Sequence, residues 1–321
     1  MDTKYINLAG ILLAGGLLAS CGGGSSSTTV SKAQLDPRVP ITSVNQGAVV
    51  STANNAAIQN MGGSSSLILN TAELALLKME QQSAVAGSAG IPIKCKVSGT
   101  YSYDTDNTAK PGSNATYFNI TYNNCIDVTG TTTDGTIKNT GVTHTTTPSN
   151  SITAEVDFIN YTVTTKTNTI KINGGFNMSS TGIATNTRIN TLKGKQLTLG
   201  VNTDNFVLED FWFVDTYDNL ATTPVPHNYR ISYEVTTTNS TNHAKDFEFG
   251  FTTSQTISKL LANAYPHTGQ FIVTGGKSTA LLVTIVPGGT AGTSTGTLTI
   301  QLSTDNRVTW GKAVTTTWAK L

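Results

Sequence analysis

A serine between two glycines is the first candidate for chemistry. Gly292-Thr293-Ser294-Thr295-Gly296 matches the pattern in which a sharp turn between a strand and a helix exposes a nucleophilic serine. That mechanism also requires a helix after the serine and a histidine base later in the chain. Here a strand-like run, Thr297–Leu302, follows the serine, and the last histidine is His267. The pattern therefore indicates a turn rather than a nucleophile.

The histidines and carboxylates show no spacing typical of a catalytic or metal site. No histidine lies at ligand spacing from a cysteine or from another histidine, so we interpret each as a surface or strand residue: His144, His227, His243 and His267. A carboxylate pair for glycoside chemistry would form only if folding brought Glu209 and Glu248 together. Folding can also assemble metal ligands from distant strands. The sequence itself predicts no catalytic residue, no metal and no cofactor, and a protein that is not an enzyme.

The N-terminal segment predicts export and a lipid on Cys21. Tyr5–Leu18 is an apolar run too short to span a bilayer as a helix, and it follows a single lysine, as in a cleaved signal peptide. Leu18-Ala19-Ser20-Cys21 resembles the lipobox of bacterial lipoproteins, in which the cysteine thiol accepts a diacylglycerol before cleavage. The resemblance implies that residues 1–20 are removed. Gly22, rather than Asp, follows the cysteine, which implies that the lipoprotein is sorted to the outer membrane. Either face of that membrane agrees with the sequence. An ordinary secretory signal is the alternative.

Cys95 and Cys125 remain as an even pair once lipid occupies Cys21. In an oxidising compartment this pair predicts a disulfide. Closing a loop of about 30 residues would stabilise the fold by roughly 3.6 kcal/mol on the chain-entropy estimate. Two free buried thiols are the alternative.

The residues after the anchor are typical of a tether. Residues 21–66 are rich in glycine, serine and other small residues, which predicts a flexible segment with a reach of about 35 to 40 Å. Part of this segment could order by docking on the body. A short helix is then expected from Asn70, a capping residue with Glu73 three positions later, to about Gly87. A continued tether is the alternative.

Residues 67–321 have the composition of a β-rich body. The chain contains 57 threonines, which favour strands, and 27 asparagines with 30 glycines, which favour turns. Only 12% of residues are charged and the formal net charge is +1, so nothing in the charge favours nucleic acid as a partner.

Alternating residues predict strands whose two faces differ. In Thr116–Tyr122, Phe118 and Ile120 alternate with polar neighbours, as in a half-buried strand. Asp134-Gly135 and Asn173-Gly174 have the composition of hairpin turns between β-rich runs. We therefore predict a mainly β fold of antiparallel meander sheets, forming a sandwich or an open barrel, with one short N-terminal helix. The length also admits two sub-domains divided near residue 200.

Parts of the body resemble uncharacterised β-rich proteobacterial lipoproteins. The similarity covers about half of the mature chain and is carried by four segments: Gly99-Thr100-Tyr101, Phe118–Cys125, Asp134-Gly135-Thr136 and Tyr265–Gly275. It implies a fold and no activity. Near the end, Thr304-Asp305-Asn306-Arg307 replaces an acidic stretch of those relatives, with Arg307 where a calcium site would need an acid.

Two classes of function agree with these patterns. The first is a membrane-anchored binding or structural module of the envelope, held by lipid on Cys21, whose partner is an envelope protein or a glycan. The second is a β-barrel carrier of a lipid or another small apolar ligand, which would require a closed interior.

Overall fold

The computed structural model describes most of the body and a short stretch of the predicted tether. The described residues are 38–54, 90–105, 115–128, 130–145, 151–182, 187–218, 220–221, 225–238, 247–260, 263, 265–289 and 291–321. The predicted signal peptide (1–20), Cys21 and the helix expected between Asn70 and Gly87 lie outside these residues.

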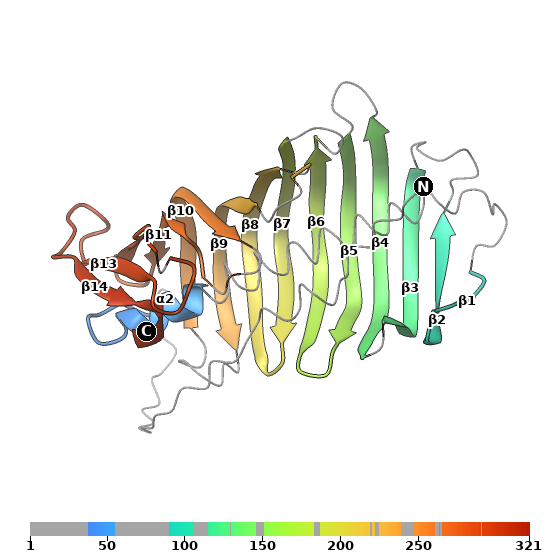
Figure 1. The fold of residues 1–321 in the computed structure, drawn as a ribbon, viewed down its shortest axis with the longest axis horizontal. Helices are drawn as coiled ribbons and strands as arrows, with labels where there is room; N and C mark the ends of the chain where they lie inside the picture. Colours follow the sequence, from blue (N-terminus) through green and yellow to red (C-terminus); the bar gives the residue numbers. More distant parts are fainter. Residues whose placement is uncertain are drawn as a thin grey trace.

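The described strands form a single 14-stranded sheet, in which every strand lies beside its neighbours in the sequence (Figure 1). The strands are β1 (Ile93–Lys94), β2 (Ser98–Thr105), β3 (Ala115–Val128), β4 (Thr131–Thr145), β5 (Ser151–Thr164), β6 (Thr169–Thr181), β7 (Thr187–Val201), β8 (Asp204–Asp218), β9 (Pro226–Thr238), β10 (Phe247–Leu260), β11 (Thr268–Thr274), β12 (Ala280–Ile285), β13 (Thr297–Ser303) and β14 (Val314–Thr317). The described helices are α2 (Gln46–Ala53) and the short 3₁₀ helix η4 (Trp318–Lys320).

The sheet is an open antiparallel meander, which confirms the mainly β prediction. The short α-helix that the structure describes, α2, lies within the predicted tether and is not the helix expected after Asn70. The strand order places β1 and β14 at opposite edges, and these two strands do not pair with each other. β7 and β8 pair from Thr187↔Asp218 to Val201↔Asp204, so the sheet continues without a break through residue 200. The strands described here therefore form one open sheet.

Alternating side chains give the sheet a buried apolar face and an outward polar face. In β5, the residues at every second position from Ile152 to Phe158 are buried, and those between them are exposed or partly exposed. In β3, Phe118, Ile120 and Tyr122 are buried, as the sequence predicted. Because successive side chains of a strand point to opposite faces, this pattern follows directly from the sequence.

The buried face carries aromatic rings that lie close to one another, both on neighbouring strands and, for β6 and β8, across the intervening strand β7. Phe158, Phe176 and Phe211 lie on β5, β6 and β8, with ring centroids 5.9 and 6.4 Å apart. Farther along, Phe251 of β10 stacks on Phe271 of β11 at 4.9 Å. Each of these rings is at most 2% exposed. Pairs at such distances stabilise a core beyond simple burial of their area.

Asp134-Gly135 and Asn173-Gly174 do not form the hairpins that the sequence predicted. Both pairs lie inside long strands, β4 and β6, at places where the pairing register shifts by one residue. Gly135 and Gly174 have φ values of +98° and +117°, which L side chains rarely adopt. Both dipeptides are therefore parts of β-bulges rather than turns.

The bulges of neighbouring strands form a series across the sheet. Asn124 in β3, Asn160 in β5 and Asp210 in β8 have positive φ values of 47°, 49° and 45°, and each lies at a register shift. Asn and Asp tolerate this conformation better than other non-glycine residues. Since a bulge bends a strand and increases its twist, the series lets strands of 13 to 15 residues form one curved sheet.

Residues 38–54, inside the predicted tether, pack against the C-terminal strands. Figure 1 shows α2 beside this end of the sheet, far from β1 and β2. Pro40 forms a parallel bridge with Gly276, and the amide of Ile41 donates to the Thr279 hydroxyl at 2.8 Å. Ile41 and Val50 are buried in the core. These contacts tie the segment to the turn between β11 and β12.

Candidate functional site

The outward face of β4 to β7 carries polar side chains in rows that run across the strands. Pairing places Thr140 opposite Glu155, Glu155 opposite Asn177, and Asn177 opposite Lys193. Neighbouring strands lie about 4.8 Å apart, so these side chains form one continuous row. A second row contains Thr153, Ser179 and Thr191 in the same way.

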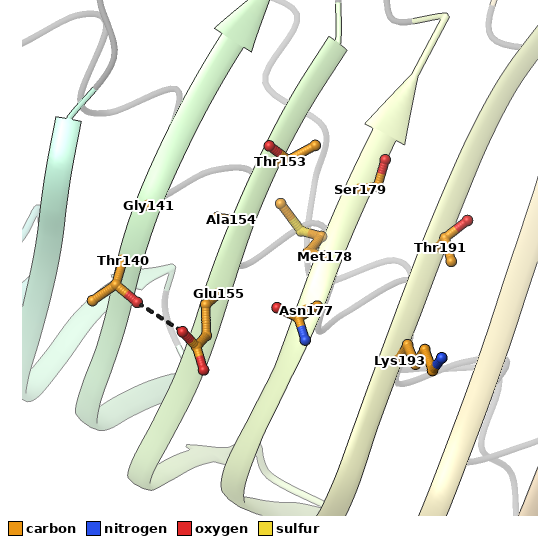
Figure 2. A pocket seen from close by; sticks show the side chains of 10 residues that line it. All are labelled: Thr140, Gly141, Thr153, Ala154, Glu155, Asn177, Met178, Ser179, Thr191 and Lys193. Carbon is orange, nitrogen blue, oxygen red and sulfur yellow. Dashed lines mark hydrogen bonds between the residues drawn. The ribbon is translucent and has the colours of Figure 1, made fainter.

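These two rows line a hollow of about 470 Å³ (Figure 2). Its residues come from four strands: Thr140, Gly141, Thr153, Ala154, Glu155, Asn177, Met178, Ser179, Thr191 and Lys193. The Thr140 hydroxyl donates to Glu155 Oε2 at 3.4 Å, while the Lys193 side chain lies at the other end of the row in Figure 2. The hollow thus offers hydroxyl, amide, carboxylate and ammonium groups from four paired strands.

Gly141 allows the hollow to reach β4. The β4–β5 register shifts between Thr140 and Thr143, and Gly141 has a positive φ of +58°. A Cβ on Gly141 would meet nothing within 4 Å, so this position opens onto free space. The bulge therefore leaves a gap in the polar face that no side chain fills.

An indole extends the first row beyond the hollow. Trp212 of β8 pairs with Lys193 and is partly exposed on the same face. The Arg230 guanidinium lies 5.8 Å from the centroid of the Trp212 ring. A flat ring beside hydrogen-bonding groups suits the recognition of a polar molecule with apolar patches.

No family model, curated protein or solved structure matches the chain.

Cys95 and Cys125 form the disulfide that the sequence predicted, with their Cα atoms 5.6 Å apart. It joins the segment before β2 to β3. Asp127 Oδ1 accepts a hydrogen bond from the Lys96 amide at 3.1 Å, and the two sulfurs and an Asp127 oxygen lie within 4.8 Å of one another. Thiolates ligate metals, whereas these sulfurs are bonded to each other, so the group does not form a metal site.

The structure does not place Glu209 and Glu248 as opposed carboxylates. Glu209 lies on β8 and pairs with Glu234 of β9, while Glu248 lies on β10 and pairs with Thr236. Glu234 forms an ion pair with Arg38 at 3.1 Å. The carboxylate that pairs with Glu209 is therefore that of Glu234, whose charge is neutralised by Arg38.

Ser294 lies in a turn, as expected from the strand that follows it. The Gly296 amide donates to the Thr293 carbonyl at 3.0 Å, and β13 begins at Thr297. Of the other histidines, His243 lies outside the described residues, His144 belongs to β4, and His267 precedes β11. No helix among the described residues is long and apolar enough to cross a membrane.

A buried Asp–His pair is the feature that sequence reasoning missed. His227 Nδ1 and Asp215 Oδ2 lie 2.8 Å apart, and the residues are 8% and 1% exposed. His227 also stacks on Tyr217 with ring centroids 4.3 Å apart. The two partners lie 12 residues apart on β8 and β9, so only the pairing register of these strands could have revealed the contact.

The pair belongs to a wider polar cluster at one end of the buried face. Arg188 Nε donates to the Ser180 hydroxyl at 3.2 Å and to Asn190 Oδ1 at 3.3 Å. Asn190 pairs with Asp215 across the strands. Burial raises the pKa of the Asp215 carboxyl, although its hydrogen bond with His227 and the nearby Arg188 charge oppose this effect. The side chains of this cluster are buried and form hydrogen bonds with one another.

Lys259 pairs with His227 at this end and gives a testable pH dependence. Burial lowers the pKa of Lys259 to about 8 from 10.5. Between these values the unfolded chain binds more protons than the folded one, so stability should rise with pH across this window and be lowest below pH 8. Replacing Lys259 by methionine should therefore raise the free energy of unfolding at pH 7 by about 3 kcal/mol.

Urea unfolding at pH values from about 7 to 10 measures this effect for the wild type and Lys259→Met. The buried Tyr122 and Tyr233 have raised pKa values, so both proteins should lose stability at still higher pH, and their difference isolates Lys259. Parallel pH profiles for the two proteins would contradict the prediction.

Proposed function

We propose that this chain is a lipid-anchored, exported envelope protein of a bacterial outer membrane that binds a glycan on its outward sheet face. The hollow on β4 to β7 carries the proposal. Its hydroxyl, amide and charged groups match the hydroxyl-rich surface of a sugar chain, and Trp212 adds a flat ring of the kind that packs against a sugar's apolar face. The anchor is supported by the lipobox Leu18–Cys21 and by the resemblance of the body to β-rich lipoproteins.

Several features favour binding over catalysis or transport in this proposal. The hollow contains one carboxylate, Glu155, whereas glycoside hydrolysis requires two. A carrier of apolar ligands would need a closed interior, and the described strands form an open sheet. We therefore propose a non-enzymatic binding module and favour it over the carrier.

Cosedimentation of the full chain with purified, insoluble cell-wall glycan tests the binding site. Glu155→Ala, Asn177→Ala and Lys193→Ala together should weaken binding about a hundredfold, because they remove two charged and one neutral hydrogen-bonding group from the row. The matched control changes the adjacent row on the same face, with Lys138→Ala, Asp157→Ala and Gln196→Ala. Equal binding by the wild type and both triple variants, or no binding by the wild type, would refute the proposal that the hollow binds this glycan.

Metabolic labelling with a fatty acid tests the anchor separately. Cys21→Ser should abolish incorporation of the label and leave the precursor unprocessed, because Cys21 is the acylation candidate in the lipobox. A Cys95→Ser/Cys125→Ser protein should remain labelled. Equal labelling of the wild type and Cys21→Ser would show that the anchor assignment is wrong.

A further inference from the structure

Three exposed cations gather at the C-terminal end of the sheet. Lys277 lies in the turn between β11 and β12, and Arg307 and Lys312 lie in the connection between β13 and β14. The two segments touch, because the Asn306 amide donates to the Ser278 carbonyl at 2.8 Å. None of the three cations forms a salt bridge with another residue of the described chain.

Hydrogen bonds hold the β13–β14 connection in a defined shape. Asp305 Oδ1 accepts from the Ser303 hydroxyl at 2.7 Å and from the Thr309 amide at 3.0 Å. The Arg307 amide donates to the Ser303 hydroxyl oxygen at 2.9 Å. Asp305 is the one acid among these cations, and its oxygens are used within the loop. The loop therefore projects Arg307 outward. The three cations and Asp305 together carry a net charge of +2.

Apolar side chains accompany the cations on this connection and at the start of β14. Val308 is 79% exposed and Val314 is 49% exposed, while Trp310 is partly exposed. From Arg307 to Val314, two cations thus lie close in sequence to exposed or partly exposed apolar side chains. Cations beside valine and tryptophan are the combination expected at the boundary between water and an anionic membrane.

The tether reaches the sheet at the same end. The Val39 carbonyl accepts from the Gly276 amide at 3.0 Å, next to Lys277. Arg38 lies 17 positions after Cys21 (38 − 21), and the tether expected from the sequence would have an r.m.s. reach of about 21 to 25 Å over that length. If lipid holds Cys21 in the membrane, this end of the sheet is held close to the bilayer.

We propose that this basic end, formed by Lys277, Arg307, Val308, Trp310 and Lys312, docks on the anionic lipid surface of the membrane that carries the anchor. The expected orientation rests on the proposed lipid at Cys21, whereas the affinity of the basic end for lipid does not. Because β4 lies eight strands from β12 (12 − 4), docking would hold the hollow up to about 38 Å away from the lipid along the sheet.

Vesicle cosedimentation of residues 22–321, which lack both Cys21 and the apolar segment Tyr5–Leu18, tests the surface without the anchor. In this background we compare the unchanged basic end with K277Q/R307Q/K312Q, on vesicles containing equal amounts of phosphatidylglycerol and phosphatidylcholine. Each cation near an anionic membrane contributes about a fivefold factor, so the triple variant should bind about a hundredfold more weakly. The matched control K94Q/K138Q/K171Q removes the same charge from exposed positions on β1, β4 and β6.

The expected difference should disappear on pure phosphatidylcholine vesicles and in about 1 M salt, where charges are screened within about 3 Å. An environment-sensitive dye on Val308→Cys should shift to the blue on anionic vesicles, whereas a dye on Thr121→Cys should not. Equal losses in the two triple variants, or no loss in K277Q/R307Q/K312Q, would overturn the proposal. Failure of fatty-acid labelling at Cys21 would refute the anchor and leave this binding result intact.

Discussion

Replacing Gly135 by alanine should lower the free energy of unfolding by about 4 kcal/mol. Gly135 has φ = +98°, and a Cβ there would lie 2.3 Å from the Asn160 carbonyl oxygen and 2.7 Å from the Tyr161 Cα. The backbone conformation alone costs an L residue about 1 to 2 kcal/mol, and forced overpacking adds about 1 to 3 kcal/mol. The obstacles are backbone atoms of β5, which cannot rotate away as a side chain could.

Two control glycines separate these causes in urea unfolding. Gly141 also has a positive φ, +58°, but a Cβ added to it would have no atom within 4 Å, so Gly141→Ala should cost about 1 kcal/mol. Gly288 has free space and no positive φ, so Gly288→Ala should change stability by less than about 0.5 kcal/mol. Similar losses for Gly135→Ala and Gly288→Ala would contradict the bulge as the source of the effect.

The same position shows why the fold class was predictable and the strand boundaries were not. Alternation is a local signal, so the buried positions of β3 around Phe118 and Ile120 could be recognised from the sequence. Asp-Gly is also a local signal, and by itself it favours a hairpin turn. Gly135 instead lies where the backbone of Asn160, 25 positions later, approaches it closely. That approach depends on the pairing of β4 with β5, which no short stretch of sequence contains.

The candidate site depends on non-local strand pairing even more than the strand boundaries do. Thr140, Glu155, Asn177 and Lys193 look like ordinary solvent-facing strand residues, because each is isolated in its own strand. They become a row only when the registers of four strands are known.

The disulfide was predictable because it required only a count of the cysteines and no knowledge of strand register. Once Cys21 is assigned to lipid, Cys95 and Cys125 have no other partner of their kind.

Removing that disulfide should lower the free energy of unfolding by about 3.6 kcal/mol, because it closes a loop of 30 residues in the unfolded chain. The Cys95→Ala/Cys125→Ala protein and the wild type in a reducing agent should both show the loss in urea unfolding. The reducing agent should not change the double variant, which therefore controls for effects on the rest of the protein. Equal stability of the oxidised and reduced wild type would contradict the prediction.

The loss should be concentrated at the edge that the disulfide secures. β1 contains two residues, and the segment between it and β2 is held by the bonds of Cys95 N to the Gly99 carbonyl and Val97 N to the Ile126 carbonyl. An open sheet exposes unpaired backbone groups at its edge, so a covalent link from this edge to β3 limits its local opening. Amide hydrogen exchange should accelerate in β1 to β3 of the reduced protein under native conditions, whereas β12 and β13, at the far end, should keep their rates. Uniform acceleration across the sheet would instead indicate that the disulfide acts only on global unfolding.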